Sequence, residues 1–120
     1  DISLAKSLII TAEIDLRFLK KLAIEEDSAR KIMTNYYDIL RSVLEAKLSL
    51  DGYKVYSHEA FTYYLKEMGE ERIAERFDIL RKIRNGINYY GKNITIVEVK
   101  EHVAEIKTII KVLEEKYFKE

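Results

Sequence analysis

The sequence contains no cysteine, which excludes disulfide bonds and thiolate-bound metal sites and makes a reducing compartment the default expectation. Proline is absent and glycine occurs only four times, so few residues interrupt a regular backbone. Abundant Ile, Leu, Lys and Glu favour an all-helical chain. No apolar run approaches the roughly 18 residues of a transmembrane helix, and the first residues lack the layout of a signal peptide. We therefore expect a soluble, cytoplasmic protein.

The chain also lacks an excess of either charge. Its 21 basic and 21 acidic side chains give a net charge of zero, which argues against a protein that coats nucleic acid through bulk charge. Any anion site must therefore be local. His58 and His102 lie on different predicted helices, and no HExxH, Glu-x-x-His or glycine-rich phosphate loop occurs, so we expect no metal and no cofactor.

Apolar periodicity predicts five helices within one domain, residues 1–120. The predicted helices cover about 3–23, 28–50, 57–68, 70–88 and 95–118. Asp27 or Ser28 is expected to cap the second helix, and Ser57 the third; Thr95 and Glu98 form a capping box for the last. Residues 86–93 are expected to break the fourth helix. Links of about two to seven residues predict an all-α fold, an up-down antiparallel bundle of four long helices plus one short helix.

The first predicted helix has an unusually broad apolar face. One track of apolar residues recurs at spacings of three and four, and a second track widens it; the second track is Leu4, Leu8, Ile14, Phe18 and Leu22. A face of this width is typical of a bundle helix that touches two neighbours.

The fourth predicted helix carries a cation in its apolar stripe. Ile73, Phe77, Leu80, Arg84 and Ile87 recur at spacings of three and four. At about 100° per residue, Arg84 lies near the centre of this stripe. A guanidinium does not lose its charge, and removing it from water without a partner costs several kcal/mol. Arg84 therefore either extends outward along the core or meets a carboxylate, a carbonyl group, a second subunit or an anionic ligand.

The residues around Arg84 favour an anionic ligand. Residues 81–93 contain four cations and no acid, together with amide and phenol donors. The candidate phosphate-binding residues are Arg81, Arg84, Asn85, Asn88, Tyr89, Tyr90 and Lys92.

Tyrosine is abundant, with nine residues, and some occur as adjacent pairs. In the pairs Tyr36-Tyr37 and Tyr63-Tyr64, only one member is expected to point into a narrow core. Such tyrosines either pack with their hydroxyls reaching water or line a dimer interface or an anion-binding cleft. His58 is expected to be a polar residue of a first helical turn, and His102 a half-buried or surface residue.

The chain resembles the HEPN domain family, the helical partners of prokaryotic minimal nucleotidyltransferases. The resemblance rests on helix number and order, on residues 50–53 and 57–60 (LDGY and SHEA), and above all on residues 80–91 (LRKIRNGINYYG). The family motif is an arginine, a polar residue and, after four to six intervening positions, a histidine. Arg84 and Asn85 match its beginning, whereas positions 89, 90 and 91 are Tyr, Tyr and Gly.

Three kinds of function are considered, and the first two are what the resemblance implies. The first is a homodimeric accessory module that binds a nucleotide or RNA phosphate near Arg84 and acts with a separately encoded nucleotidyltransferase, in some relatives by modification of a tyrosine near the motif. The second is a metal-independent endoribonuclease of the toxin type that uses Arg84, Asn85 and Tyr89 or Tyr90, in which two subunits bring their motifs together. A tyrosine, with a pKa near 10, replaces the motif histidine poorly at neutral pH. The third, from the residues alone, is a structural oligomerisation bundle in which a buried carboxylate pairs with Arg84.

Overall fold

The computed structural model describes residues 1–119, and within them all regular secondary structure is helical. There are five helices: α1 (Ile2–Lys20), α2 (Ala29–Leu50), α3 (His58–Glu67), α4 (Glu71–Tyr90) and α5 (Ile96–Tyr117). The all-α class agrees with the apolar periodicity of the sequence.

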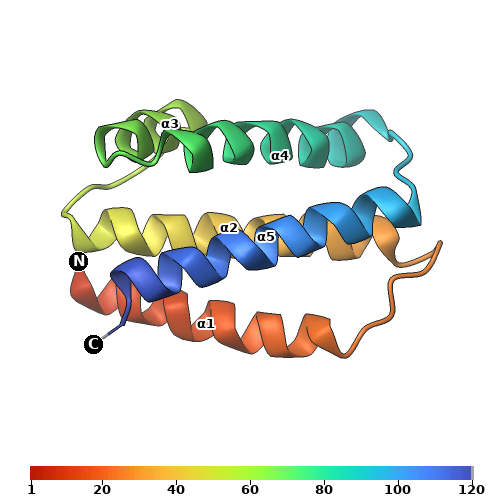
Figure 1. Ribbon diagram of the computed structural model, residues 1–120, viewed down its shortest axis with the longest axis horizontal. Coiled ribbons are helices and arrows are strands. Elements are labelled where there is room, and N and C mark those ends of the chain that lie inside the picture. Colours follow the sequence, from red (N-terminus) through yellow and green to blue (C-terminus); the bar gives the residue numbers. More distant parts are fainter. Residues whose placement is uncertain (120) are drawn as a thin grey trace.

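Helix α2 lies at the centre of the molecule. Helices α1, α3, α4 and α5 all pack against it, and α3 also packs along α4. In Figure 1, α1 lies on one side of α2 and the α3–α4 pair on the other, while α5 crosses α2 between them. Most side chains of α2 are buried as a result, including Leu40, Val43 and Leu44, which are fully shielded from solvent. Burial of this one helix therefore organises the core.

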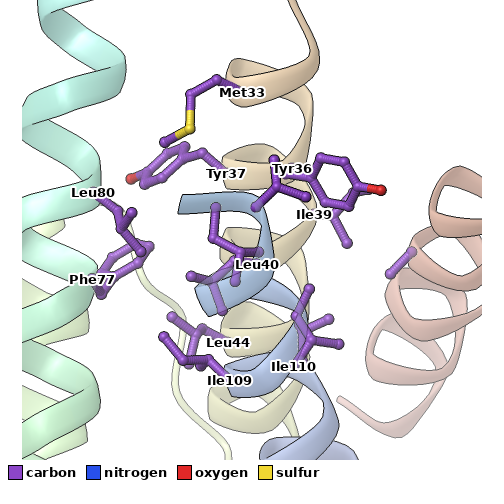
Figure 2. Packing of buried hydrophobic residues seen from close by; sticks show 14 of the residues in the cluster. Met33, Tyr36, Tyr37, Ile39, Leu40, Leu44, Phe77, Leu80, Ile109 and Ile110 are labelled. Atoms are coloured by element: carbon purple, nitrogen blue, oxygen red, sulfur yellow. The ribbon is translucent and has the colours of Figure 1, made fainter. Parts of the chain in front are cut away.

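Tyr36 and Tyr37 are both buried, so the expectation that only one of them faces the core was wrong. Their residues retain 2% and 3% of their surface. The two rings point to opposite sides of α2, and Tyr37 points toward α4 (Figure 2). A helix with neighbours on several sides can bury two adjacent residues, whereas a helix at the edge of the fold cannot. Tyr63, on the peripheral α3, remains 59% exposed.

Two of the three predicted helix starts are confirmed by their hydrogen bonds. The Ser57 hydroxyl accepts from the backbone N–H of Ala60 at 3.2 Å. Thr95 and Glu98 form the reciprocal capping box expected from their spacing. Ser28 precedes α2, but its hydroxyl donates to the Ala23 carbonyl instead of capping the helix.

Helix α4 ends within the stretch that was expected to end it, residues 86–93, although Gly86 itself does not interrupt the helix. Gly86 is helical and buried, and the helix ends only at Gly91, whose φ of 62° is the left-handed conformation that favours glycine. The Lys92 N–H closes this end by donating to the Gly86 carbonyl at 3.0 Å. Burial of Ile87 against the core explains why one glycine does not end the helix. Arg81, Arg84, Asn85 and Tyr89 consequently lie on one continuous helix.

Candidate functional site

A pocket of about 310 Å³ opens where α2, α3 and α4 meet. It combines three arginines and an imidazole with aromatic rings. The lining residues are Tyr37, Arg41, His58, Phe61, Phe77, Arg81, Arg84, Asn85 and Tyr89. A pocket that gathers cations over an apolar base is suited to an anionic group.

The base of the pocket is a cluster of aromatic rings around Phe77. The ring centroid of Phe77 lies 5.4 Å from that of Tyr37, in a stacked arrangement, and 5.5 Å from that of Phe61. Two guanidinium groups lie over these rings: Arg41 is 5.4 Å from the Phe61 centroid and Arg84 is 5.5 Å from the Tyr37 centroid. Cation–π contacts at this distance hold the arginines without neutralising them.

Arg84 is only loosely satisfied by its own chain. Its side chain is 26% exposed, and Nη2 lies 3.4 Å from Oδ1 of Asp38. Nη1 donates to the neighbouring Asn85 side chain at 3.3 Å. Its Nε is buried and has no hydrogen-bond partner within residues 1–119. Long, single contacts of this kind leave most of the donor capacity of a guanidinium unused.

Asp38 is not the buried carboxylate that a purely structural role for Arg84 required. Its side chain is 52% exposed. Partial desolvation raises the pKa of Asp38, and the positive charges of Arg84 and Arg41 offset that rise only in part. The ion pair is therefore weak, as expected for a single contact at the surface.

Asp78 organises the other side of the pocket. Its carboxylate lies 3.1 Å from Lys82 Nζ, 2.5 Å from Nε2 of His58 and 3.4 Å from Nη2 of Arg81. The hydrogen bond with Lys82 lowers the pKa of Asp78 to about 2; the bonds to His58 and Arg81 act in the same direction, while burial opposes them. Arg81 Nε is buried and, in the described part of the chain, has no partner. One carboxylate thus faces three cationic or ionisable groups.

His58 was not expected to belong to the site. Sequence reasoning made it a polar residue of a first turn, and it is indeed the first residue of α3, directly after the capping Ser57. The structure also places it in the pocket, with its ring stacked 5.7 Å from Phe77. Its Nδ1 is buried without a hydrogen-bond partner among residues 1–119. The sequence signals at His58 were its position after a helix cap and its place in the SHEA segment, and neither indicates a contact with Asp78, 20 residues away.

The structure brings together four of the seven predicted binding residues: Arg81, Arg84, Asn85 and Tyr89 line the pocket. Asn88 and Tyr90 are exposed and are not among the lining residues. Lys92 follows the end of α4 and lines a separate hollow around Gly86. Successive residues of a helix point in different directions, so residues that are contiguous in the sequence are divided between the pocket and other surfaces.

Tyr37 contributes a neutral hydroxyl to the pocket. Burial raises its pKa, although Arg84, Arg41 and Arg81 lower it in part. Within residues 1–119, no group of three or more His, Cys, Asp or Glu side chains is arranged to hold a metal ion. In the same range, no helix combines the length and hydropathy needed to span a bilayer.

Comparisons of the chain with protein-family models, with curated proteins and with solved structures gave no match. The pocket itself is therefore the basis for assigning a function.

Proposed function

We propose that this chain is an HEPN-type up-down helical bundle whose pocket binds the phosphate of a nucleotide or of RNA, and that it acts as an accessory module for a separately encoded nucleotidyltransferase. One observation carries the proposal. Arg41, Arg81 and Arg84 converge on one pocket, and the buried Nε atoms of Arg81 and Arg84 lack partners within residues 1–119.

The chemistry of the lining supports a phosphate in particular. The planar fork of arginine matches the oxygens of a phosphate with two parallel hydrogen bonds, and it is less hydrated than an ammonium group. No carboxylate is among the described lining residues, since Asp38 and Asp78 stand at the edges. The ring of Tyr89, which is 69% exposed, offers a surface on which a base can stack. A nucleotide would thus find both a charged and an aromatic contact.

A thermal-shift titration tests the binding proposal. Inorganic phosphate, AMP and a short RNA are added to the wild type, to Arg84→Ala and to Arg76→Ala. By mass action, a ligand of the folded state raises the free energy of unfolding by about 2.7 kcal/mol at a concentration 100 times its Kd. We expect a saturable rise for the wild type and for Arg76→Ala, and none for Arg84→Ala. A flat titration of the wild type with all three ligands would contradict the proposal.

The position of His58 supports a second candidate, the metal-independent endoribonuclease. In such a reaction the RNA 2′-oxygen attacks the adjacent phosphorus and the 5′-oxygen leaves, so one proton is removed and one is supplied. His58 has the chemistry for either transfer, and Arg84 for stabilising the phosphoryl oxygens. A phenol such as that of Tyr89 transfers protons less readily at neutral pH than an imidazole does. The structure-based version of this candidate therefore uses His58 in place of the motif histidine.

RNA cleavage assays in EDTA test the second candidate. If the protein is an endoribonuclease that uses His58, we expect the wild type to cleave RNA. Cleavage should be lost in Arg84→Ala and in His58→Ala and kept in Tyr89→Phe. If Tyr89→Phe loses RNA cleavage and His58→Ala keeps it, the proton-transfer role belongs to the tyrosine. An inactive wild type at high protein concentration eliminates the enzyme and leaves the binding module.

A further inference from the structure

His58 is the one described lining residue of the pocket between α2, α3 and α4 whose charge can change near neutral pH. Arginine stays cationic and a phenol stays neutral in that range, whereas an imidazole gains or loses its proton between about pH 5 and 8. The His58 side chain is 17% exposed and belongs to the first residue of α3, so it is part of the pocket wall. The charge of that wall therefore depends on the protonation state of this one ring.

Asp78 of α4 holds the ring through Nε2. Its Oδ1 lies 2.5 Å from Nε2 of His58, and the Thr62 hydroxyl of α3 lies 3.5 Å from the same nitrogen. The hydrogen bond with Lys82, together with those of His58 and Arg81, lowers the pKa of this carboxyl to about 2, so it is ionised over the whole range in which an imidazole titrates. A neutral ring consequently donates its Nε2–H to the carboxylate, and Nδ1 has no partner within residues 1–119.

The other charged groups that face the ring oppose its protonation. Arg81 and Arg84 of α4 and Arg41 of α2 line the pocket with it, and each repels a further positive charge. Tyr37 of α2 adds no charge, because burial raises the pKa of its hydroxyl. Protonation also turns Nδ1 into a buried donor with no partner in the described part of the chain, which costs free energy. Three cations thus act against the protonated ring, and one carboxylate, that of Asp78, favours it.

We propose that binding of an anion in this pocket is accompanied by the uptake of a proton from solvent on His58, so that the site binds phosphate more tightly at pH 6 than at pH 8. The pocket is small, about 310 Å³, so an anion within it lies close to every lining side chain. A negative charge within about 4–6 Å favours the protonated form of a group by a factor of ten or more. Linkage requires the converse: the protonated, cationic ring raises the affinity for the anion by the same factor.

Asp38, at the edge of the pocket, is a competing source of pH dependence. It lies 3.4 Å from Arg84, and burial raises its pKa, with the charges of Arg84 and Arg41 opposing this rise in part. Protonation of Asp38 would release Arg84 for an anion, also in acid. Variants separate the two sources, since Asp38→Asn removes one titration and His58→Gln removes the other. The inference rests on the proposed phosphate site and adds its regulation by pH.

Isothermal titration between pH 5.5 and 8.5, with sulfate and with the dinucleotide UpU, tests the proposal. Both probes keep their charge over this range, whereas a phosphate monoester titrates near pH 6. We expect the wild type and Asp38→Asn to bind about tenfold more tightly at pH 6 than at pH 8. His58→Gln should bind with one affinity throughout, close to that of the wild type at pH 8. A wild-type affinity that does not change with pH, or a pH dependence that remains in His58→Gln, overturns the proposal.

His102→Gln is the matched control, because His102 is the other histidine of the chain and is not among the described lining residues. It should keep the full pH dependence. Circular dichroism melts at each pH establish that the variants are folded. If neither probe binds the wild type at any pH, the proposed phosphate site is itself wrong. Binding without pH dependence leaves that site in place and removes only the coupling to His58.

NMR spectra of the histidine rings identify the group that takes up the proton. The chain has two histidines and so gives two Cε1–H signals, which the spectrum of His58→Gln assigns. Saturating sulfate should move the midpoint of the His58 titration to higher pH and leave that of His102 in place. Asp78→Asn should move the His58 midpoint to lower pH, with and without sulfate, because it removes the carboxylate that favours the protonated ring. A His58 midpoint that sulfate does not move overturns the proposal.

Discussion

Two arginines of α4, Arg76 and Arg84, lie about two turns apart, and their surroundings differ sharply. Toward the start of the helix, Arg76 forms a two-point pair with Glu105 of α5, with Nε–Oε2 and Nη2–Oε1 distances of 2.5 and 2.8 Å. The hydrogen bond to Glu105 raises the pKa of Arg76 further above its ordinary value. Two turns later, Arg84 makes a single long contact with the exposed Asp38. One arginine joins two helices, whereas the other keeps its donors available for a ligand.

The largest effect is expected at the aromatic base that supports the open end of α4. Phe77 is 1% exposed and contacts Tyr37, Phe61 and His58. Phe77→Ala should lower the free energy of unfolding by about 3–5 kcal/mol, because the substitution leaves a cavity in a packed core. Urea denaturation measures the loss. Tyr63→Ala, at a 59% exposed position, is the control and should lose less than about 1 kcal/mol.

Replacing each arginine by methionine tests the comparison directly. Arg76→Met should cost about 1 kcal/mol, because it leaves Glu105 without its two-point partner at a site that is partly exposed. Arg84→Met should change the free energy of unfolding by less than about 0.5 kcal/mol, since its pair with Asp38 is weak and a methionine can lie on the Tyr37 ring. Chemical denaturation of both variants gives the answer. Equal losses would show that Arg84 has the same structural role as Arg76.

The carboxylate beside the pocket gives the fold a pH dependence. Because the pKa of Asp78 falls to about 2 in the folded state, its ionised form stabilises the fold above the ordinary carboxyl pKa near 4. This contribution should be lost as the pH falls from about 4 to 2. It amounts to about 1 kcal/mol after allowance for solvent screening of a carboxylate that is 31% exposed. Melts between pH 2 and 5 should show a steeper loss for the wild type than for Asp78→Asn. Parallel curves would contradict this assignment.

The smallest effect concerns the acid that partly occupies Arg84. Asp38→Asn removes the competing charge, so phosphate should bind about twofold more tightly, in line with the energy of roughly 0.5 kcal/mol for an exposed ion pair. Isothermal titration with phosphate measures the change. Glu105→Gln, which releases Arg76 instead, serves as the control and should leave the affinity unaltered. A weaker affinity in Asp38→Asn would mean that Asp38 orients Arg84 for the ligand.

The helices could be predicted from the sequence because their determinants are local. Apolar spacing and the Thr95–Glu98 capping box place α5 within a residue or two of its observed bounds. The end of α4 was expected within residues 86–93 and lies at Tyr90, while Gly86 stays helical because the intrinsic cost of a helical glycine, about 1 kcal/mol, is smaller than the gain from burying Ile87. Propensity at one residue thus gave way to packing.

The site could be predicted only where it lies on one helix. Arg81, Arg84, Asn85 and Tyr89 share α4, so their spacing already placed them together. His58 and Arg41 reach the pocket from other helices. No local sequence pattern predicts a contact between His58 and Asp78, which are 20 residues apart. The burial of both Tyr36 and Tyr37 was missed for the same reason, since it depends on how many helices surround α2.

The continuity of α4 through Gly86 also has an energetic consequence for any ligand. Four of the pocket's polar side chains belong to one uninterrupted helix, so their Cα positions are fixed before the ligand binds. Association therefore has to freeze only side-chain torsions, at roughly 0.5–1.5 kcal/mol for each, and no backbone segment has to become ordered. A small anion can accordingly be held by few contacts.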